Sequence, residues 1–240
     1  MEEILSKING LKTNFKCEKC GNIQKANIFP FINFNENPEY YALVKDLDIF
    51  NIKCEKCGSI SSVKYDSLFL NETQKYFIYL LNDKDLVDKF RHQITYFIET
   101  VLNKDDKYNF EQFTTRLVFS KNELVEKLAI FEIGLNDKVI EFIKYGFFDH
   151  GLIDLSKYDS VYFDGIKETK LEFILFNSNR DVEIDKIFID IQFYNNLVEK
   201  INKIKDDIFV FPFNNIPFSV VYIVIIFYIV YFIQVIFLFN

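Results

Sequence analysis

The sequence predicts an α+β protein in which an N-terminal β region carries two cysteine turns and a larger part mixes helices with strands. Three observations support this fold class. The four cysteines lie in two nearly identical nonapeptides, helix and strand periodicities alternate further along, and the last stretch is almost wholly apolar. We expect the β region to span residues 1–65 and the α+β domain residues 66–205. A linker, residues 206–217, is expected to lead into a hydrophobic segment, residues 218–239.

Composition and charge limit the classes of function. The chain has 240 residues, half of them hydrophobic, which is enough to bury a core, so a folded protein is expected. A formal net charge of -7 repels phosphate backbones, so a general nucleic-acid binder is not expected. Met1–Lys16 is mostly polar and lacks the apolar run of a secretory signal. We therefore expect a cytoplasmic protein whose cysteines stay reduced.

The N-terminal β region is expected to consist of short strands between turns. Phe29–Phe34 and Leu47–Lys53 alternate apolar and polar residues well enough to form hairpin strands. The 33 residues between the two cysteine pairs, Gly21–Lys53, are expected to loop out through Asn33–Pro38.

The α+β domain is expected to begin with a hairpin of Val63–Leu70 and Lys75–Leu81. A helix should follow over residues 85–101, where apolar residues recur at helical spacing, and then a strand over Phe113–Phe119. The next helix has clear ends. Ser120-Lys-Asn-Glu123 has the spacing of a capping box at its start, and Gly134 suits its end.

The rest of the domain continues the mixed pattern. A short helix is expected near 137–145, followed by strands near 160–163, 170–176 and 182–189. A last helix is indicated by apolar residues that share one face: Tyr194, Leu197, Val198, Ile201 and Ile204.

The hydrophobic segment is long enough to cross a membrane. In Phe218–Phe239 only Ser219 and Gln234 are clearly polar. As a helix these residues would span about 33 Å, against a hydrocarbon core of about 30 Å. We expect a C-terminal transmembrane helix that anchors a cytoplasmic domain to the cell membrane. Two alternatives are a pair of buried strands in the soluble domain and an out-of-frame tail.

The cysteines predict one metal site formed by Cys17, Cys20, Cys54 and Cys57. Each Cys-Glu-Lys-Cys turn places two thiols on one side of a tight loop, and the glycine that follows tolerates a positive φ. Two such turns complete a tetrahedron of sulfur ligands, which suits zinc. Four protein ligands leave no open position, so we expect a structural site. The metal is expected to set the fold of the first 65 residues.

Other roles for the cysteines fit the sequence less well than zinc. Rubredoxin also holds a single redox-active iron with two such turns, so iron is an alternative. It is the lesser one, because the core tryptophan and the acidic Gly/Pro-rich middle of rubredoxin are missing here. Two disulfides would suit a secreted protein. A thioredoxin-like role needs a helix after the motif, and neither cysteine pair is followed by a helical pattern.

These motifs resemble the CpXC domain, a prokaryotic family named for two Cys-Pro-x-Cys motifs and without an established function. The resemblance covers the cysteine pairs, the acidic Asn37-Pro-Glu39 segment, the hairpin after Cys57 and the two helices after Ser120, roughly residues 11–205. It implies a zinc-ribbon-like β region. Here Glu18 and Glu55 replace the name-giving prolines, which metal ligation does not need.

No catalytic residue is predicted. His92 and His150 have no partner at motif spacing, and no phosphate-binding loop, nucleophile elbow or zinc-protease motif occurs. We expect a non-enzymatic binding or scaffold module with an unknown protein partner. Binding of nucleic acid is a further alternative, because six lysines cluster around the cysteines: Lys16, Lys19, Lys25, Lys53, Lys56 and Lys64.

Overall fold

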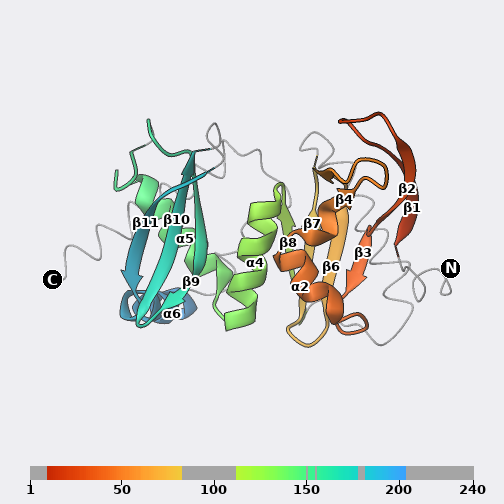
Figure 1. Cartoon of the computed structure of the whole chain (residues 1–240). Helices are drawn as coiled ribbons and strands as arrows, with labels where there is room; N and C mark the ends of the chain where they lie inside the picture. Colours follow the sequence, from red (N-terminus) through yellow and green to blue (C-terminus); the bar gives the residue numbers. More distant parts are fainter. Residues whose placement is uncertain (1–9, 83–111, 150, 155, 178–181, 204–240) are drawn as a thin grey trace. The chain divides into compact units, whose positions relative to one another are not determined.

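The computed structural model describes residues 10–82, 112–149, 151–154, 156–177 and 182–203 (Figure 1). The chain divides into two compact units, residues 1–191 and 192–240. Within the described residues the fold mixes helices and strands, and the four cysteines cluster in the N-terminal region. The α+β fold class is confirmed to this extent.

The first unit contains a four-stranded sheet, named the central sheet. Its order is β3 (Phe31–Asn33), β6 (Ser67–Asn71), β7 (Tyr76–Leu80) and β8 (Thr114–Val118). β6 and β7 form the predicted antiparallel hairpin, and β8 is the predicted strand before Ser120. The outer strands each run parallel to their neighbours, so chain segments far apart in sequence meet in one sheet.

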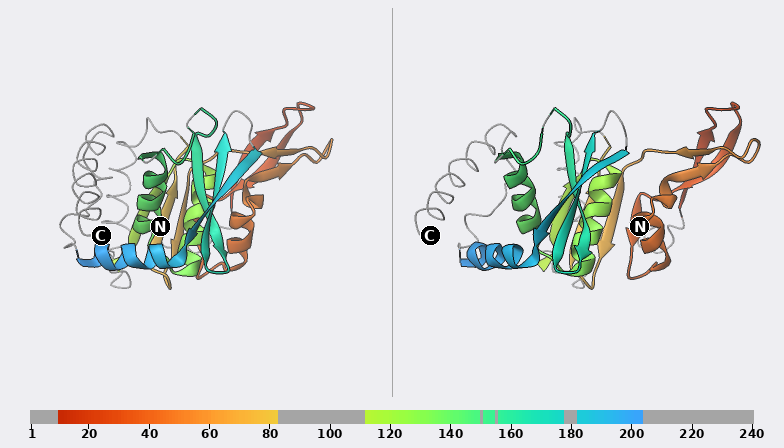
Figure 2. Two further views of the ribbon diagram at one scale, coloured as in Figure 1. Left: turned by 90° about the vertical axis from the view of Figure 1, so that its left-hand side faces the viewer. Right: turned by 60° about the vertical axis from the view of Figure 1, so that its left-hand side comes forward.

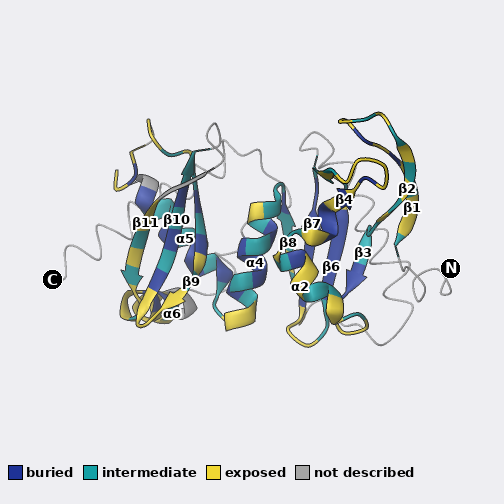
Figure 3. Ribbon diagram, in the orientation of Figure 1, coloured by how far each residue is buried: buried dark blue, intermediate teal, exposed yellow. Residues whose placement is uncertain are grey.

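Both faces of this sheet are buried, which explains why its central strands are almost continuously apolar. On one face Phe69, Ile78 and Leu80 form a core with α2 (Glu39–Lys45), a 3₁₀ turn at Asp48–Phe50 and α4 (Lys121–Ile133). On the other face Leu68, Leu70, Phe77, Tyr79 and Phe113 form a second cluster. Figure 3 shows the two central strands, β6 and β7, mostly in dark blue, the colour of buried residues.

Helix α4 begins and ends as the sequence predicts. The Ser120 hydroxyl accepts a hydrogen bond from the Glu123 N–H at 3.1 Å, and the Glu123 carboxylate accepts one from the Phe119 N–H at 2.7 Å. At the other end Gly134 has φ +76°, and its N–H donates to the carbonyls of the last turn. The two signals were local, so their prediction needed no tertiary contact.

A three-stranded antiparallel sheet completes the first unit. It consists of β9 (Ser160–Lys167), β10 (Lys170–Asn177) and β11 (Val182–Asp190), in the order β11-β10-β9. Helix α5 (Asp137–Asp149) packs on it through Phe147, whose ring lies 5.0 Å from that of Phe173. Helix α4 contacts β7 and β8 on one side and β9 on the other, so it lies between the two sheets. The three strands and α5 were predicted, though β9 and α5 are each longer than expected.

Buried charges connect α4 and α5. The Lys144 ammonium lies 2.8 Å from both carboxylate oxygens of Glu126, and Glu126 also accepts a hydrogen bond from the Phe163 N–H at 2.7 Å. Glu126 is 3% exposed. Asp137 is paired with Arg116, and Lys127 lies 3.5 Å from Asp137. Each charge therefore has an opposite partner, which is what burial of an ion requires.

Two short hairpins carry the cysteines. β1 (Leu11–Lys16) pairs with β2 (Ile23–Ile28), and β4 (Asn51–Lys53) pairs with β5 (Ile60–Ser62). Figure 2 shows these hairpins extending together away from α2.

One of the two predicted hairpin strands lies in a hairpin and the other does not. Asn51–Lys53, the end of the predicted strand Leu47–Lys53, forms β4 and pairs with β5, while the residues before it form the 3₁₀ turn. Within Phe29–Phe34, β3 joins the central sheet parallel to β6 and belongs to no hairpin. The segment Asn33–Pro38, expected to loop out, forms turns between β3 and α2. Helix α2 itself was not predicted. Alternating hydrophobicity identifies a strand but not its partner.

The boundary predicted at residue 65 stays a prediction. Ile32, Val44 and Phe50 lie before it and Phe69 and Leu124 after it, and all five pack in one cluster.

Helix α6 (Ile191–Lys203) belongs to the second unit from Gln192 onward. Of its predicted apolar face, Tyr194 and Leu197 are buried, and Ile204 lies outside the described residues. The predicted helix over 85–101, the histidines His92 and His150, and the hydrophobic segment 218–239 all lie outside the described residues. Among the residues that the structure describes, no helix is both long and apolar enough to cross a membrane.

Candidate metal centre

The duplicated nonapeptide folds into the same turn twice. In each copy the N–H of the first cysteine donates to the carbonyl five residues on, over 2.8 Å in both turns. The glycine N–H donates back to the carbonyl of that cysteine over 2.8 and 2.9 Å. The residues involved are Cys17, Gly21 and Asn22 in the first turn and Cys54, Gly58 and Ser59 in the second. Equal sequences thus give equal local structures.

Both turns depend on a left-handed residue. Gly21 has φ +70° and Gly58 has φ +71°, as the sequence predicted. A side chain at these positions would meet no other atom within 4 Å, so the need for glycine comes from the backbone conformation alone.

The structure brings the four predicted cysteines together. Their Sγ atoms all lie within 4.8 Å of one another. Cys17 Sγ is 3.7 Å from Cys57 Sγ, and Cys20 Sγ is 3.6 Å from Cys54 Sγ. A tetrahedral zinc with sulfur at about 2.3 Å requires sulfur atoms roughly 3.8 Å apart. A disulfide requires about 2.05 Å, and all four cysteines are free. The donor set therefore fits a metal ion.

The first cysteine of each turn is buried and the second is more exposed. Cys17 and Cys54 are 0% and 1% exposed and pack with Phe15 and Ile52, one apolar residue from each hairpin. Partly buried side chains that pack against this cluster include Ala26 and Val63. Phe15 and Ile52 occupy equivalent positions in the two copies of the duplicated unit, and so do Ala26 and Val63. The hairpins thus share only a small apolar core, with the cysteines at its end.

Polar side chains next to the turns reach across the site. The Ser59 hydroxyl lies 3.3 Å from Cys17 Sγ and 3.0 Å from Cys57 Sγ. Asn22, at the equivalent position of the first copy, points its amide at Cys54 Sγ over 3.9 Å. Each residue that follows a turn glycine therefore contacts the first cysteine of the other turn. Such contacts orient metal ligands and neutralise part of their charge.

The protonation of the thiols is uneven. The hydroxyl of Ser59 and the N–H of Cys20 lower the pKa of Cys17 to about 6. The pKa of Cys57 is also lowered, chiefly by the Ser59 hydroxyl. The Asn22 N–H favours the thiolate of Cys20, but burial and the neighbouring thiols outweigh it and raise the pKa of Cys20 to about 12. Four thiolates at this spacing repel one another, so binding of a cation by this set releases protons.

Sequence reasoning found the four cysteines but missed the residues around them. Gln24 donates from its amide to the Lys53 carbonyl at 3.0 Å and accepts from the Glu55 N–H at 2.9 Å, so it links the first hairpin to the second turn. The polar residue after each glycine was a signal in the duplicated sequence. No such signal existed for Gln24, because its partners belong to the other hairpin.

The lysines that were grouped around the cysteines are all exposed: Lys16, Lys19, Lys25, Lys53, Lys56 and Lys64. Within the described ranges, the four cysteines form the one group of three or more potential ligands that could hold a metal ion. Ligation itself stays a prediction.

The sequence was compared with protein families, with curated proteins and with solved structures. The CpXC protein family matches residues 15–144, which is more than half of the chain. No curated protein and no solved structure gives a significant match. The match covers both cysteine turns, the central sheet and helix α4.

Proposed function

The chain belongs to the CpXC family, and on that premise we propose that it is a non-enzymatic zinc-binding protein whose metal holds a binding or scaffold module in shape. The ligands are Cys17, Cys20, Cys54 and Cys57. One observation carries this proposal. Two turns with the same backbone hydrogen bonds, one from each hairpin, bring four thiols within 4.8 Å of one another.

The choice of zinc follows from the ligands. An all-thiolate tetrahedron suits zinc, which has no geometric preference of its own and no redox chemistry. When bound, zinc supplies four strong bonds and cancels half of the thiolate charge. Four protein ligands leave no position for water or substrate, so this is a structural centre rather than a catalytic one.

The chain's own residues explain why a clamp is needed here. β4 and β5 have three residues each, and the apolar cluster between the hairpins is small. Two-stranded hairpins of this size are marginal in water. The cysteines lie at the far end of the hairpins, where a metal adds the contacts that packing does not provide.

Elemental analysis of the full chain, purified without added metal, tests the proposal. One zinc per chain and no colour is the expected result. One iron per chain with a red colour would support a rubredoxin-like electron-transfer protein instead. Stoichiometric disulfides with no metal would remove the basis of both.

Hydrogen exchange of a Cys17→Ser, Cys54→Ser variant tests the structural role. We expect protection to be lost in β1, β2, β4 and β5 and to persist in β3, β6 and β7, because β3 packs in the central core. A matched control, Ser61→Ala, should leave all of these strands protected. Unchanged protection of the hairpins in the double variant would contradict the clamp.

Nucleic-acid binding is a second candidate, supported by the exposure of the six lysines around the turns. The acidic total charge opposes it. Binding of a labelled oligonucleotide that survives physiological salt would favour this function, whereas binding only at low salt reflects charge alone.

Membrane tethering through residues 218–239 remains a prediction of the sequence. Cell fractionation with and without residues 210–240 tests it, and equal solubility of the two forms would count against an anchor.

A further inference from the structure

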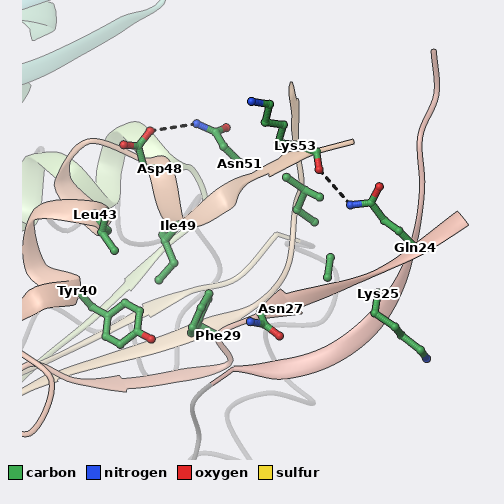
Figure 4. A pocket seen from close by; sticks show the side chains of 12 residues that line it. Gln24, Lys25, Asn27, Phe29, Tyr40, Leu43, Asp48, Ile49, Asn51 and Lys53 are labelled. Carbon is green, nitrogen blue, oxygen red and sulfur yellow. Dashed lines mark hydrogen bonds between the residues drawn. The ribbon is translucent and has the colours of Figure 1, made fainter. Parts of the chain in front are cut away.

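A groove opens between the two cysteine hairpins, on the side that faces α2 (Figure 4). Its volume is about 340 Å³. Four consecutive residues of β2, Gln24–Asn27, line one wall, and all three residues of β4, Asn51–Lys53, line the other. Side chains alternate along a strand, so a wall made of consecutive residues is a strand edge rather than a strand face.

The ladder shows which backbone groups face outward on β2. The Cys17 N–H donates to the Asn22 carbonyl, so these two residues form a hydrogen-bonded pair. Such pairs alternate along an antiparallel ladder, and the residues between them turn their N–H and C=O away from the partner strand. On β2 these residues are Ile23, Lys25 and Asn27, of which Lys25 and Asn27 line the groove. Within the described part of the chain, no backbone bond joins them to a third strand.

The same counting applies to β4. The Cys54 N–H donates to the Ser59 carbonyl, so the N–H and C=O of Asn51 and Lys53 point away from β5. The Asn51 N–H donates to the Asp48 carbonyl at the end of the 3₁₀ turn, so the groups that β4 offers to the groove are the Asn51 C=O and the Lys53 N–H. The Gln24 amide donates to the Lys53 carbonyl at 3.0 Å, which agrees with this direction. That contact closes the groove at the end next to the cysteine turns, as the dashed line in Figure 4 shows.

The side chains give the groove an apolar floor and a charged rim. Ile49 and Ile52 are buried along it, and the rings of Phe29 and Tyr40 lie 5.1 Å apart at its α2 end. Leu43, which is 39% exposed, continues the apolar surface. The exposed lysines Lys25 and Lys53 stand on opposite walls, and Asp48 at the edge is hydrogen-bonded to Asn51.

We infer that this groove binds an extended peptide segment of a partner protein, in which acidic side chains alternate with apolar ones. Outward N–H and C=O groups on two strand edges can be satisfied by a backbone that adds as a strand. Alternate side chains of that strand would face the floor at Ile52 and the rim at Lys25 and Lys53. The two lysines select acidic residues at the rim by charge complementarity.

The probe is a fluorescein-labelled hexapeptide of alternating glutamate and valine, titrated with the full chain and followed by fluorescence anisotropy. We expect saturable binding that weakens as salt is raised. A peptide of the same sequence with N-methylated amides along one edge should bind about tenfold or more weakly, because its donors are removed. A peptide with lysine in place of glutamate should also bind more weakly.

Two proline variants test which edge is used. Asn27→Pro removes an outward donor from the groove, and we expect a roughly tenfold loss of peptide affinity. Asn14→Pro is the matched control, because Asn14 is an outward residue on the opposite edge of the same hairpin, where it pairs with Lys25. It should leave peptide affinity within a factor of about two.

Three results would overturn the inference. One is no saturable binding at about 1 mM peptide. Another is equal affinity of the N-methylated and unmodified peptides for the unaltered protein, a comparison that holds even if a proline variant misfolds. The third is tighter binding of a single-stranded oligonucleotide that displaces the peptide. Metal content is measured on the same samples, so a failure of the zinc proposal is seen separately from a failure of peptide binding.

Discussion

Replacing Ser59 by alanine should weaken metal binding without unfolding the hairpins. The Ser59 hydroxyl lies 3.0 Å from Cys57 Sγ and 3.3 Å from Cys17 Sγ, so it is within hydrogen-bond reach of two of the proposed ligands. Its single proton can serve one sulfur at a time. Alanine removes this donor and leaves the Ser59 carbonyl, which accepts from the Cys54 N–H at 2.8 Å, in place.

Two independent estimates give the size of the effect. A hydrogen bond to a charged group contributes about 1.5–3 kcal/mol, which corresponds to roughly a 10- to 150-fold change in affinity. Loss of a residue that supports a metal ligand typically costs about 10- to 100-fold in metal affinity. We therefore expect Ser59→Ala to lower zinc affinity between about tenfold and a hundredfold.

Competition with a chromophoric chelator at fixed pH measures this change. Ser61→Ala is the matched control, since it is the same substitution two residues along in β5 and should change zinc affinity by less than about twofold. Asn22→Ala should have a smaller effect than Ser59→Ala, because its amide lies 3.9 Å from Cys54 Sγ. Equal affinities for the Ser59 and Ser61 variants would refute the role of the hydroxyl.

Three further predictions concern stability. Lys144→Met should lower the free energy of unfolding by about 3 kcal/mol because it leaves Glu126 buried and unpaired, and adding Glu126→Gln should restore roughly half of this in urea denaturation; no recovery in the double variant would contradict the pairing. Burial alone would raise the pKa of Asp137, but the Arg116 guanidinium and a nearby ammonium hold it below its ordinary value. Because the pKa of Asp137 is lower in the folded than in the unfolded protein, the ion pair contributes stability above pH 3.8, and this contribution is lost as the pH falls through the folded pKa. Urea denaturation between about pH 5 and pH 2 should show a smaller loss in Asp137→Asn, and an identical pH profile would argue against it. Gly58→Ala should cost about 1 kcal/mol through backbone strain, measured by thermal melting of the hairpins, and an unchanged midpoint would contradict a left-handed residue there.

The buried charges show why the two sheets meet in one arrangement. Glu126 on α4 is paired with Lys144 on α5 and is also hydrogen-bonded to the backbone of β9. A shift of α5 would leave a buried charge without a partner, which costs far more than the loss of an apolar contact.

Local features of this protein were predictable from the sequence alone. The two cysteine turns, the capping box at Ser120 and the stop at Gly134 each depend on contacts within a few residues, and the structure shows each one as expected. The hairpin of β6 and β7 was found for the same reason, since a short turn brings its strands together. The grouping of the four cysteines was also expected, because two equal turns suggest one shared site.

Pairings between distant segments were decided only by the tertiary structure. β3 was recognised as a strand, but its parallel neighbour β6 lies more than thirty residues on, and the alternating pattern of β3 suits any partner. The same holds for the Gln24 contact with Lys53, the ion pair of Glu126 with Lys144, and the groove between β2 and β4. The sequence by itself determined the cysteine turns and the helix caps, because these follow from backbone geometry over a few residues. The partners of each face and edge follow from packing the whole chain, and no short stretch of sequence contains that information.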